Sequence, residues 1–247
     1  MRVNMLGVGI DNITGSEAMT LVARRIRQKQ NTVVYTPNPT MMYQAMKDSD
    51  FRRTLNRAHL NLPDGVGLRI AAALLSLPLS HRVAGIEFGE SLLAFAARTG
   101  LRVFLLGGKT GVATAAAQKL RQKHPTLTVC GVHHGYFAES ESQAICDRIE
   151  RVRADILLVC LGSPRQEKWI AKHHPRGVLV SAALGGSLDV WAGNVTLAPH
   201  VLSAMGLEWL WRICLEPNRL AKLPHILAFL CTAAAEGAKT QLLRGKL

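Results

Sequence analysis

Short, continuous apolar runs that alternate with helix-like stretches constrain the fold of this chain more than any other feature. The runs are rich in Val, Leu and Ile, and they occupy residues 33–35, 103–106, 127–132, 156–161 and 178–184. Strands without polar alternation are buried on both faces, as in a parallel sheet covered by helices. The pattern therefore predicts an α/β fold with a Rossmann-like, mostly parallel sheet and helices on both faces.

Helix-start signals occur between several of these runs. Thr14 precedes Glu17 by three residues, the spacing of a capping box, ahead of a helical stretch at 18–28. Ser140 and Gln143 have the same spacing, which predicts that Ser140 opens a helix. Further helices are expected after Pro39 and over residues 68–75 and 112–122.

The alternation of strands and helices stops after about residue 193. We therefore predict a catalytic core over 1–193 and a small, helical, basic appendage over 194–247, with a helix at 223–235 and basic residues at Lys239, Arg244 and Lys246. A basic amphipathic helix with nearby tryptophans suits a membrane interface, and the same helix could equally pack on the core. The basic tail is also compatible with a subunit interface in a homo-oligomer.

The charge balance favours anionic partners. The chain has 30 Lys and Arg against 17 Asp and Glu, a formal net charge of +13. Nucleic acid, phosphate-bearing ligands and an acidic membrane surface are all attracted by such a field. Aromatic residues are only 5%, which disfavours a stacking platform for single-stranded nucleic acid.

The expected compartment is the cytoplasm. Five cysteines without a C-x-x-C pair indicate free, buried thiols in a reducing environment. The first residues lack the apolar core of a signal peptide. No apolar run approaches the ~20 residues that span a bilayer, although contact with a membrane surface remains compatible with the sequence.

Polar residues and glycines follow the predicted strands. Asp64 lies in LPDGVG at residues 62–67, Thr36 and Asn38 lie in TPNP at 36–39, and GG and GSPRQE occupy 107–108 and 162–167. Ligands of open parallel sheets bind outside the carboxyl ends of the strands. The sequence therefore predicts one polar cleft at that edge, with Asp64 as its carboxylate.

Several familiar site types do not fit. GKT at 108–110 lacks the upstream glycine of a phosphate loop, and GGKTG at 107–111 falls short of the dinucleotide fingerprint. The sequence has no D-x-D carboxylate pair, no Cys/His zinc spacing and no G-x-S-x-G elbow. We therefore expect neither a metal nor a cofactor. A glycine turn ahead of a helix still suits a phosphate or a sugar.

Single residues of the predicted cleft also have plain structural explanations. Asn38 could cap the helix that starts at Pro39. Asp64 could be a turn residue, since Pro-Asp-Gly is turn chemistry. Arg82 could be a surface arginine. Only their combination favours a site.

The combination resembles the WecG/TagA/CpsF glycosyltransferases, family 26. The resemblance covers almost the whole chain, in order, through TPNP (36–39), LPDGVG (62–67), RVAGIE (82–87), FLLGG (104–108), GYF (135–137), GSPRQEKW (162–169), GGSLD (185–189) and GLEWLWR (206–212). It implies a Rossmann-like fold of the GT-E type. It also implies transfer of an N-acetylmannosamine-type sugar from a UDP donor to polyprenyl-diphosphate-linked N-acetylglucosamine on the inner membrane face. This step makes the linkage unit in teichoic-acid producers, and the enterobacterial relative transfers the uronic acid form.

The resemblance also implies roles for single residues. Asp64 matches the catalytic base, and Thr36, Arg82 and Gln166 match further catalytic residues. Thr36 and Asn38 match a threonine and an asparagine that contact the substrates. Other matches in the shared motifs are expected to bind substrate: Gly107, Gly108, Tyr136, Glu167 and Asp189. In the appendage Arg212 and Arg219 match arginines for the lipid diphosphate, with Lys222 nearby. Leu197 departs from the pattern, because a basic residue is usual before Ala-Pro.

These roles fit sugar-transfer chemistry. A base must take the proton of the acceptor hydroxyl as that oxygen attacks the anomeric carbon, and the leaving diphosphate needs positive groups. Because the sequence offers no second, nucleophilic carboxylate, the reaction is expected to invert the anomeric centre. Because it offers no metal motif, the reaction is also expected to proceed without a metal. Two rival functions stay open at this stage. The first is a nucleotide-dependent oxidoreductase on the same scaffold, which would carry a cofactor absorbance, and the second is a basic RNA-binding protein with steep salt dependence.

Overall fold

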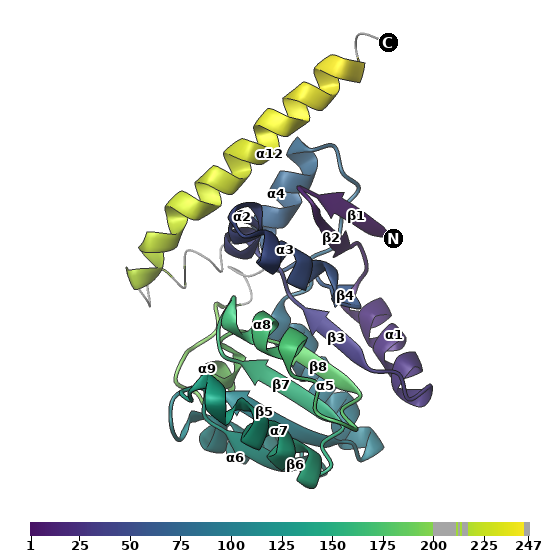
Figure 1. Cartoon of the computed structure of the whole chain (residues 1–247), viewed down its shortest axis with the longest axis vertical. Coiled ribbons are helices and arrows are strands. Elements are labelled where there is room, and N and C mark those ends of the chain that lie inside the picture. Colours follow the sequence, from purple (N-terminus) through teal and green to yellow (C-terminus); the bar gives the residue numbers. More distant parts are fainter. Residues whose placement is uncertain (200–210, 212, 214–216, 245–247) are drawn as a thin grey trace.

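A single parallel sheet forms the centre of the computed structural model, which describes residues 1–199, 211, 213 and 217–244. Its strand order is β4-β3-β8-β7-β5-β6, and every neighbouring pair is parallel (Figure 1). The strands are β3 (Thr32–Tyr35), β4 (Leu60–Asn61), β5 (Arg102–Gly107), β6 (Thr128–His133), β7 (Ile156–Cys160) and β8 (Val180–Ala183). The predicted parallel sheet is confirmed.

Helices cover both faces of the sheet because successive strand residues point to opposite sides. Val33 and Tyr35 pack into one hydrophobic cluster and Val34 packs into the other. The first cluster includes residues of α2 (Pro39–Lys47), α3 (Ser49–Asn56), α4 (Val66–Leu74), α7 (Ser142–Arg151) and α8 (Arg165–Lys172). The second includes residues of α1 (Gly15–Arg27), α5 (Gly85–Thr99), α6 (Val112–Lys123) and α9 (Ser187–Trp191).

One predicted helix start is confirmed and one is wrong. Thr14 and Glu17 form a reciprocal capping box at the start of α1. Ser140 does not open a helix, because a 3₁₀ turn, η1 (Glu139–Glu141), comes first and α7 begins at Ser142. In that turn the Glu141 carboxylate accepts from the Ala138 amide at 2.6 Å, so the acidic side chain does the capping.

An antiparallel hairpin at the start of the chain was not expected from the sequence. It consists of β1 (Arg2–Met5) and β2 (Val8–Asp11), joined at Leu6 and Gly7, which both have positive φ. The Asp11 carboxylate accepts from the backbone amide of Asn61 at 2.7 Å, which ties the hairpin to β4. The hairpin thus extends the core beside the edge strand.

The C-terminal helix α12 (Leu223–Arg244) packs against α2 and α4 and projects beyond them (Figure 1). Phe229 and Ala233 are buried in this contact, and His225 stacks on Tyr43 with ring centroids 4.9 Å apart. A Cβ at Gly237 would collide with the carbonyl oxygen of Leu74, so the helices approach closely. One face of α12 is therefore a core face, as one of the alternatives from the sequence had it.

The opposite face of α12 is exposed and apolar. Its exposed residues recur at helical spacing: Leu227, Cys231, Ala234, Ala238 and Leu242. Exposure of Cys231 contradicts the expectation of buried thiols, whereas Cys146 and Cys160 are buried. In the part of the chain that the structure describes, no helix is long and apolar enough to cross a membrane.

Candidate active site

All six parallel strands end at one edge of the sheet, and the residues singled out in the sequence follow those ends. We call the part after β3 and β4 the acidic end; it holds Thr36, Asn38 and Asp64. We call the part after β5 and β6 the glycine end; it holds Gly107, Gly108, Gly135 and Tyr136. The loops after β7 and β8 lie between the two because these strands are central in the sheet.

The acidic end is assembled by backbone hydrogen bonds between its turns. The amide of Asp64 donates to the carbonyl oxygen of Pro37 at 2.9 Å, and the amide of Val83 donates to Pro63 at 2.9 Å. Gly65 has a φ of +87°, which lets the chain turn sharply from Asp64 into α4. The turns after β3 and β4 and the segment that enters α5 are thereby held side by side.

Asp64 and Thr36 meet at the first residue of α5. The amide of Gly85 donates to Oδ2 of Asp64 at 3.4 Å. A Cβ on Gly85 would lie 3.0 Å from Oγ1 of Thr36, a tight contact that would require that hydroxyl to shift by a few tenths of an ångström. Thr36 Oγ1 donates to the carbonyl oxygen of Ala183 at 3.3 Å. A carboxylate and a hydroxyl from two strands are thus brought to the N-terminus of a helix, where negative charge is favoured.

Asn38 is the N-cap of α2, as one alternative from the sequence proposed. Its Oδ1 accepts from the amide of Met41 at 3.1 Å. The cap uses only the oxygen, and the side-chain NH₂ group has two donor hydrogens that the cap leaves for another acceptor. Capping and substrate contact are therefore compatible at this residue.

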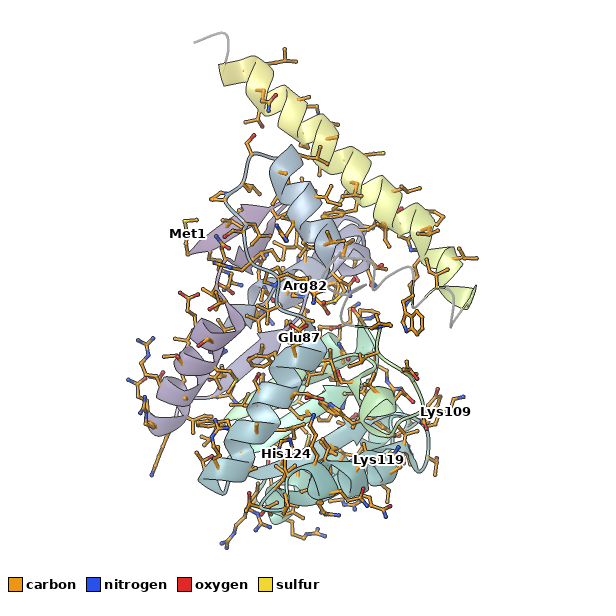
Figure 2. The ribbon with its side chains drawn as sticks, turned by 180° about the vertical axis from the view of Figure 1, so that it is seen from behind. Met1, Arg82, Glu87, Lys109, Lys119 and His124 are labelled. Carbon is orange, nitrogen blue, oxygen red and sulfur yellow. The ribbon has the colours of Figure 1, made fainter. Side chains whose placement is uncertain are left out.

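Arg82 lies just before α5 and pairs with Glu87 of that helix, at 3.0 Å between Nη2 and Oε1 (Figure 2). The arginine side chain is largely buried and the glutamate is mostly exposed. The amide of the next residue, Val83, donates to the carbonyl oxygen of Pro63 beside Asp64, so the main chain at Arg82 borders the acidic end. Arg82 and Glu87 also line one end of a groove of about 670 Å³ between α1 and α5.

Gln166 and Glu167, at the start of α8, are both buried. Nε2 of Gln166 donates to Oε1 of Glu167 at 2.7 Å, and Oε1 of Gln166 accepts from the amide of Gly185 at 3.0 Å. Burial raises the pKa of Glu167 to about 6, and the hydrogen bond from Gln166 opposes this with a smaller, lowering effect. The pair links the loop after β7 to the loop after β8.

The glycine end owes its shape to close backbone contacts. Gly107 and Gly108 have φ of +141° and +69°, and a Cβ on Gly107 would collide with the backbone of Cys160. The amide of Gly135 donates to Gly108 at 2.7 Å. Tyr136, the next residue, is 68% exposed. Beside this turn lies a cavity of about 270 Å³, lined by Thr110, Gly111, Ala113, Thr114, Val132, His133, His134 and Arg148.

Arg165 holds the glycine end in place, a role that sequence reasoning missed. Its Nη1 donates to Gly135 and its Nη2 donates to Phe137, both at 2.7 Å, and its guanidinium lies over the Phe137 ring. Gly85 was missed in the same way, although both residues lie inside the motifs quoted above. The sequence offered only a glycine and an arginine within these motifs, and neither residue type alone predicts which group it contacts.

The remaining expected residues belong to the C-terminal part or border it. The carboxylate of Asp189, in α9, accepts from Nδ2 of Asn194 at 3.4 Å, and the carbonyl oxygen of Asp189 accepts from the backbone amide of Asn194 at 2.8 Å. These two bonds shape the turn that leaves the core. Arg219 lies in the 3₁₀ helix η2 (Pro217–Lys222), and Arg212 lies outside the described residues. Leu197 is partly exposed, and Trp211 Nε1 donates to Thr196 at 3.3 Å.

This geometry places a carboxylate and a hydroxyl at one end of the edge, with the segment that carries Arg82 beside them. The other end of the edge is lined by backbone and glycine. A carboxylate next to a bound hydroxyl is suited to remove its proton. Backbone amides and cations at helix starts are suited to hold phosphate oxygens. The edge therefore has the groups for an acid-base transfer from a phosphate-linked donor.

Comparison with known proteins gives a consistent result. The sequence model described as the glycosyl transferase WecG/TagA/CpsF family matches residues 3–242. An N-acetylglucosaminyldiphosphoundecaprenol N-acetyl-beta-D-mannosaminyltransferase of Staphylococcus aureus (strain MRSA252) is 31% identical over 248 residues, 99% of this chain and 96% of that protein. The protein of the same name from Bacillus subtilis (strain 168) is 34% identical over 212 residues, 85% of this chain and 82% of that protein.

The match runs through both ends of the sheet and into α12, and it argues against the oxidoreductase and RNA-binding alternatives. It also agrees with the fold and with the residues that the edge brings together. The chain is an enzyme, and it belongs to the WecG/TagA/CpsF family of glycosyl transferases.

Proposed function

We propose that this enzyme moves an N-acetylmannosamine-type sugar from a UDP donor to polyprenyl-diphosphate-linked N-acetylglucosamine, with inversion and without a metal. The product would be a linkage unit of teichoic acid or of a similar cell-surface polysaccharide. Two relatives that are 31% and 34% identical to the chain are named as N-acetyl-beta-D-mannosaminyltransferases that act on N-acetylglucosaminyldiphosphoundecaprenol. The observation that carries the proposal is that Asp64 and Thr36 both lie at Gly85: Oδ2 of Asp64 accepts from the Gly85 amide, and a Cβ on Gly85 would lie 3.0 Å from Oγ1 of Thr36.

In the proposed reaction, the Asp64 carboxylate accepts the proton of the acceptor hydroxyl. That oxygen forms a bond to the anomeric carbon while the bond from this carbon to the diphosphate oxygen breaks, and UDP leaves with the electron pair. Attack from the face opposite UDP inverts the anomeric centre. Thr36, Asn38 and Gln166 hold the reacting sugars in line.

The negative charge that develops on UDP requires positive groups near the diphosphate. Arg82 is the cation that the acidic end supplies, because its segment is hydrogen-bonded beside Asp64. Arg212 and Arg219 of the appendage are proposed to contact the lipid diphosphate and to complete the site. In this proposal the glycine end, with Asp189, receives the nucleoside part of the donor.

We propose that the exposed apolar face of α12 contacts the inner membrane surface, where the lipid acceptor resides. Leu227 and Leu242 of that face are 60% and 68% exposed, and Ile70 and Leu74 of neighbouring α4 are also exposed. A net charge of +13 adds attraction to anionic lipids. This arrangement would place the enzyme in the cytoplasm, peripheral to the membrane.

A panel of UDP-sugars, incubated with a short-chain lipid-diphosphate-GlcNAc analogue and analysed by mass spectrometry, tests the reaction. We expect transfer from UDP-N-acetylmannosamine or its uronic acid, with equal rates in the presence and absence of a chelator. The product linkage, read by NMR, should have the configuration opposite to that of the donor. Retention of configuration, loss of activity with chelator, or transfer from none of these donors would overturn the corresponding part of the proposal.

Membrane contact is tested with vesicles that contain anionic lipid. The double variant Leu227→Glu/Leu242→Glu should lose sedimentation with vesicles while its melting temperature stays close to that of the wild type. Gln118→Glu/Gln122→Glu, on exposed positions of α6, makes the same change of charge and should still sediment. Equal sedimentation of both variants would show that α12 is not the contact, and concentration-dependent dimers lost only in the first variant would instead indicate a subunit interface.

The appendage is proposed to be required for transfer but not for the fold of residues 1–193. Because α12 buries Phe229 against α2 and α4, its removal exposes an apolar surface. We expect a chain that ends at residue 193 to keep the far-ultraviolet circular dichroism of the α/β core and to lose vesicle binding and transfer. Full transfer by that shortened chain would contradict this role.

A further inference from the structure

A buried carboxylate lies next to the proposed site, and the reaction as described above does not use it. Glu167 is fully buried, at 0% exposure. Its Oε1 accepts from Gln166, whereas its Oε2 has no hydrogen-bond partner among the described residues. Burying an ionisable group with incomplete hydrogen bonding is costly, so its presence calls for a specific reason.

The contact with Gln166 decides which way the Gln166 amide faces. An ionised carboxylate can only accept hydrogen bonds, so it must meet the NH₂ group of the amide and not its oxygen. The amide oxygen is then directed to the amide of Gly185, which donates to it at 3.0 Å. One hydrogen of the NH₂ group is used by Glu167, and the second remains to donate elsewhere.

The main chain of Glu167 is held from the other side. The hydroxyl of Tyr35 donates to the carbonyl oxygen of Glu167 at 3.1 Å. Tyr35 is followed by Thr36, which donates to Ala183 at 3.3 Å, two residues before Gly185. Hydrogen bonds therefore connect three elements to one another: the end of β3, the end of β8 with its following loop, and the start of α8.

We propose that Glu167 is a positioning residue for sugar transfer. It fixes the side-chain amide of Gln166 and, through that amide, the loop after β8 relative to Thr36. It does not touch substrate, contrary to the expectation from the sequence, because it has no surface that solvent or a ligand reaches. This inference rests on the proposed function and on the role of Gln166 within it.

A double-mutant cycle tests the inference. We compare kcat and the donor KM of wild type, Gln166→Ala, Glu167→Ala and the double variant. Glu167→Ala should lower kcat by roughly 10- to 100-fold, as misplaced groups do, with a donor KM within about threefold of wild type. In the Gln166→Ala background the same change should cost less than about threefold in kcat, since the two residues act as one unit. Additive losses, or a loss in KM alone, would overturn the inference.

A second substitution keeps the test usable if Glu167→Ala does not fold. Glu167→Gln preserves the volume and one acceptor oxygen, but its amide can also present NH₂ to Gln166. Its kcat should fall by less than that of Glu167→Ala, and again much less in the Gln166→Ala background. Lys168→Ala is the control on the same helix, because it breaks the ion pair with Asp48 on the outer side of α8 and should leave kcat unchanged.

Hydrogen exchange at the Gly185 amide gives a measurement without substrate. Exchange should be faster in Gln166→Ala and in Glu167→Ala than in wild type, and unchanged in Lys168→Ala. If the wild type transfers no sugar while exchange behaves in this way, the proposed function fails and the positioning stands. If Gly185 exchanges equally in wild type and Glu167→Ala, the positioning role is refuted whatever the activity.

Discussion

At the acidic end of the sheet, the carboxyl edge carries a carboxylate, a hydroxyl and a side-chain amide, whereas at the glycine end it carries backbone, glycines and one exposed tyrosine. The side chains of the acidic end are held by hydrogen bonds to other elements: Asp64 accepts from the amide of Gly85, and Thr36 donates to the carbonyl oxygen of Ala183. The glycine end is held by Arg165, which binds carbonyl oxygens and leaves Tyr136 exposed.

From this difference we expect the acidic end to carry out the chemistry and the glycine end to bind the nucleoside. Chemistry requires a few groups fixed within a fraction of an ångström, and the acidic end provides the network for that. Binding a nucleoside requires room and an aromatic surface, and the glycine end provides those. Substitutions at the acidic end should therefore lower kcat, whereas those at the glycine end should raise the donor KM.

The largest effect is expected for Asp64→Asn. The amide cannot take the acceptor proton, so kcat should fall by roughly 10²- to 10⁴-fold, while UDP binding measured by calorimetry stays close to that of the wild type. Asp50→Asn removes an exposed carboxylate of α3 and should leave both quantities unchanged. Near-normal turnover of Asp64→Asn would remove this residue from the chemistry.

The next effect concerns the amide of Gly85. Gly85→Pro removes the N–H that donates to Asp64, and proline suits this position because it is the first of a helix and Ala84 before it has φ −68° and ψ 137°. Gly85→Ala adds the Cβ near Thr36 but keeps the N–H, so it serves as the matched control. We expect roughly 100-fold lower kcat for proline and roughly tenfold for alanine, by loss of alignment. Equal losses would show that the amide is unimportant.

A smaller effect concerns the free energy of unfolding. Glu167, a buried carboxylate next to the acidic end, should make this free energy depend on pH. Its pKa is raised from 4.5 to about 6 in the folded state. Between these values the folded state binds more protons than the unfolded state, so this group lowers stability as pH rises and its full cost is present above pH 6. Glu167→Gln, which does not titrate, should be more stable than wild type by about 2 kcal/mol at pH 7.5.

This stability difference should shrink as the pH falls from 6 to 4.5, because Glu167 becomes protonated in the folded state, and it should vanish below 4.5, where the unfolded chain is protonated as well. Urea unfolding of the two proteins at both pH values measures it. The other carboxylates are the same in both proteins, so their contributions cancel in the difference between the two free energies of unfolding. A gap of the same size at the two pH values would mean that the charge on Glu167 is not its cause.

The smallest effect is expected at the glycine end. Tyr136→Ala should raise the donor KM by roughly tenfold, the lower range for loss of one base-aromatic contact, with kcat nearly unchanged. Tyr136→Phe keeps the ring and should keep the KM. The ring is exposed, so neither variant should change the melting temperature. A loss of kcat instead of a rise in KM would assign Tyr136 to the chemistry and erase the contrast between the ends.

The sheet could be predicted from sequence because its strands are unbroken apolar runs, such as residues 156–160, with both faces buried. The hairpin of β1 and β2 could not, because each strand has four residues and its pairing depends on the positive φ of Leu6 and Gly7. For α12 the sequence offered packing on the core as one of two alternatives, but not the partners, since the fit of Gly237 on Leu74 joins positions far apart in the chain.

Within the candidate site, Asp64, Thr36 and Gln166 could be located because each follows a strand. Their mutual arrangement could not, because it depends on main-chain groups: the amides of Gly85 and Gly185 and the carbonyl oxygen of Ala183. Backbone donors leave no signature in side-chain identity. Glu167 shows the same limit, since a glutamate beside a glutamine in a motif does not reveal which of them is buried and which contacts a ligand.

The contrast between the two ends is tested most directly by measuring single-turnover transfer and UDP-sugar affinity side by side in Asp64→Asn and Tyr136→Ala. The account predicts opposite patterns: Asp64→Asn binds donor and does not transfer, whereas Tyr136→Ala binds donor weakly and transfers at nearly the wild-type rate once saturated. If both variants lose affinity and rate in the same proportion, the edge acts as one undivided site and the account is wrong.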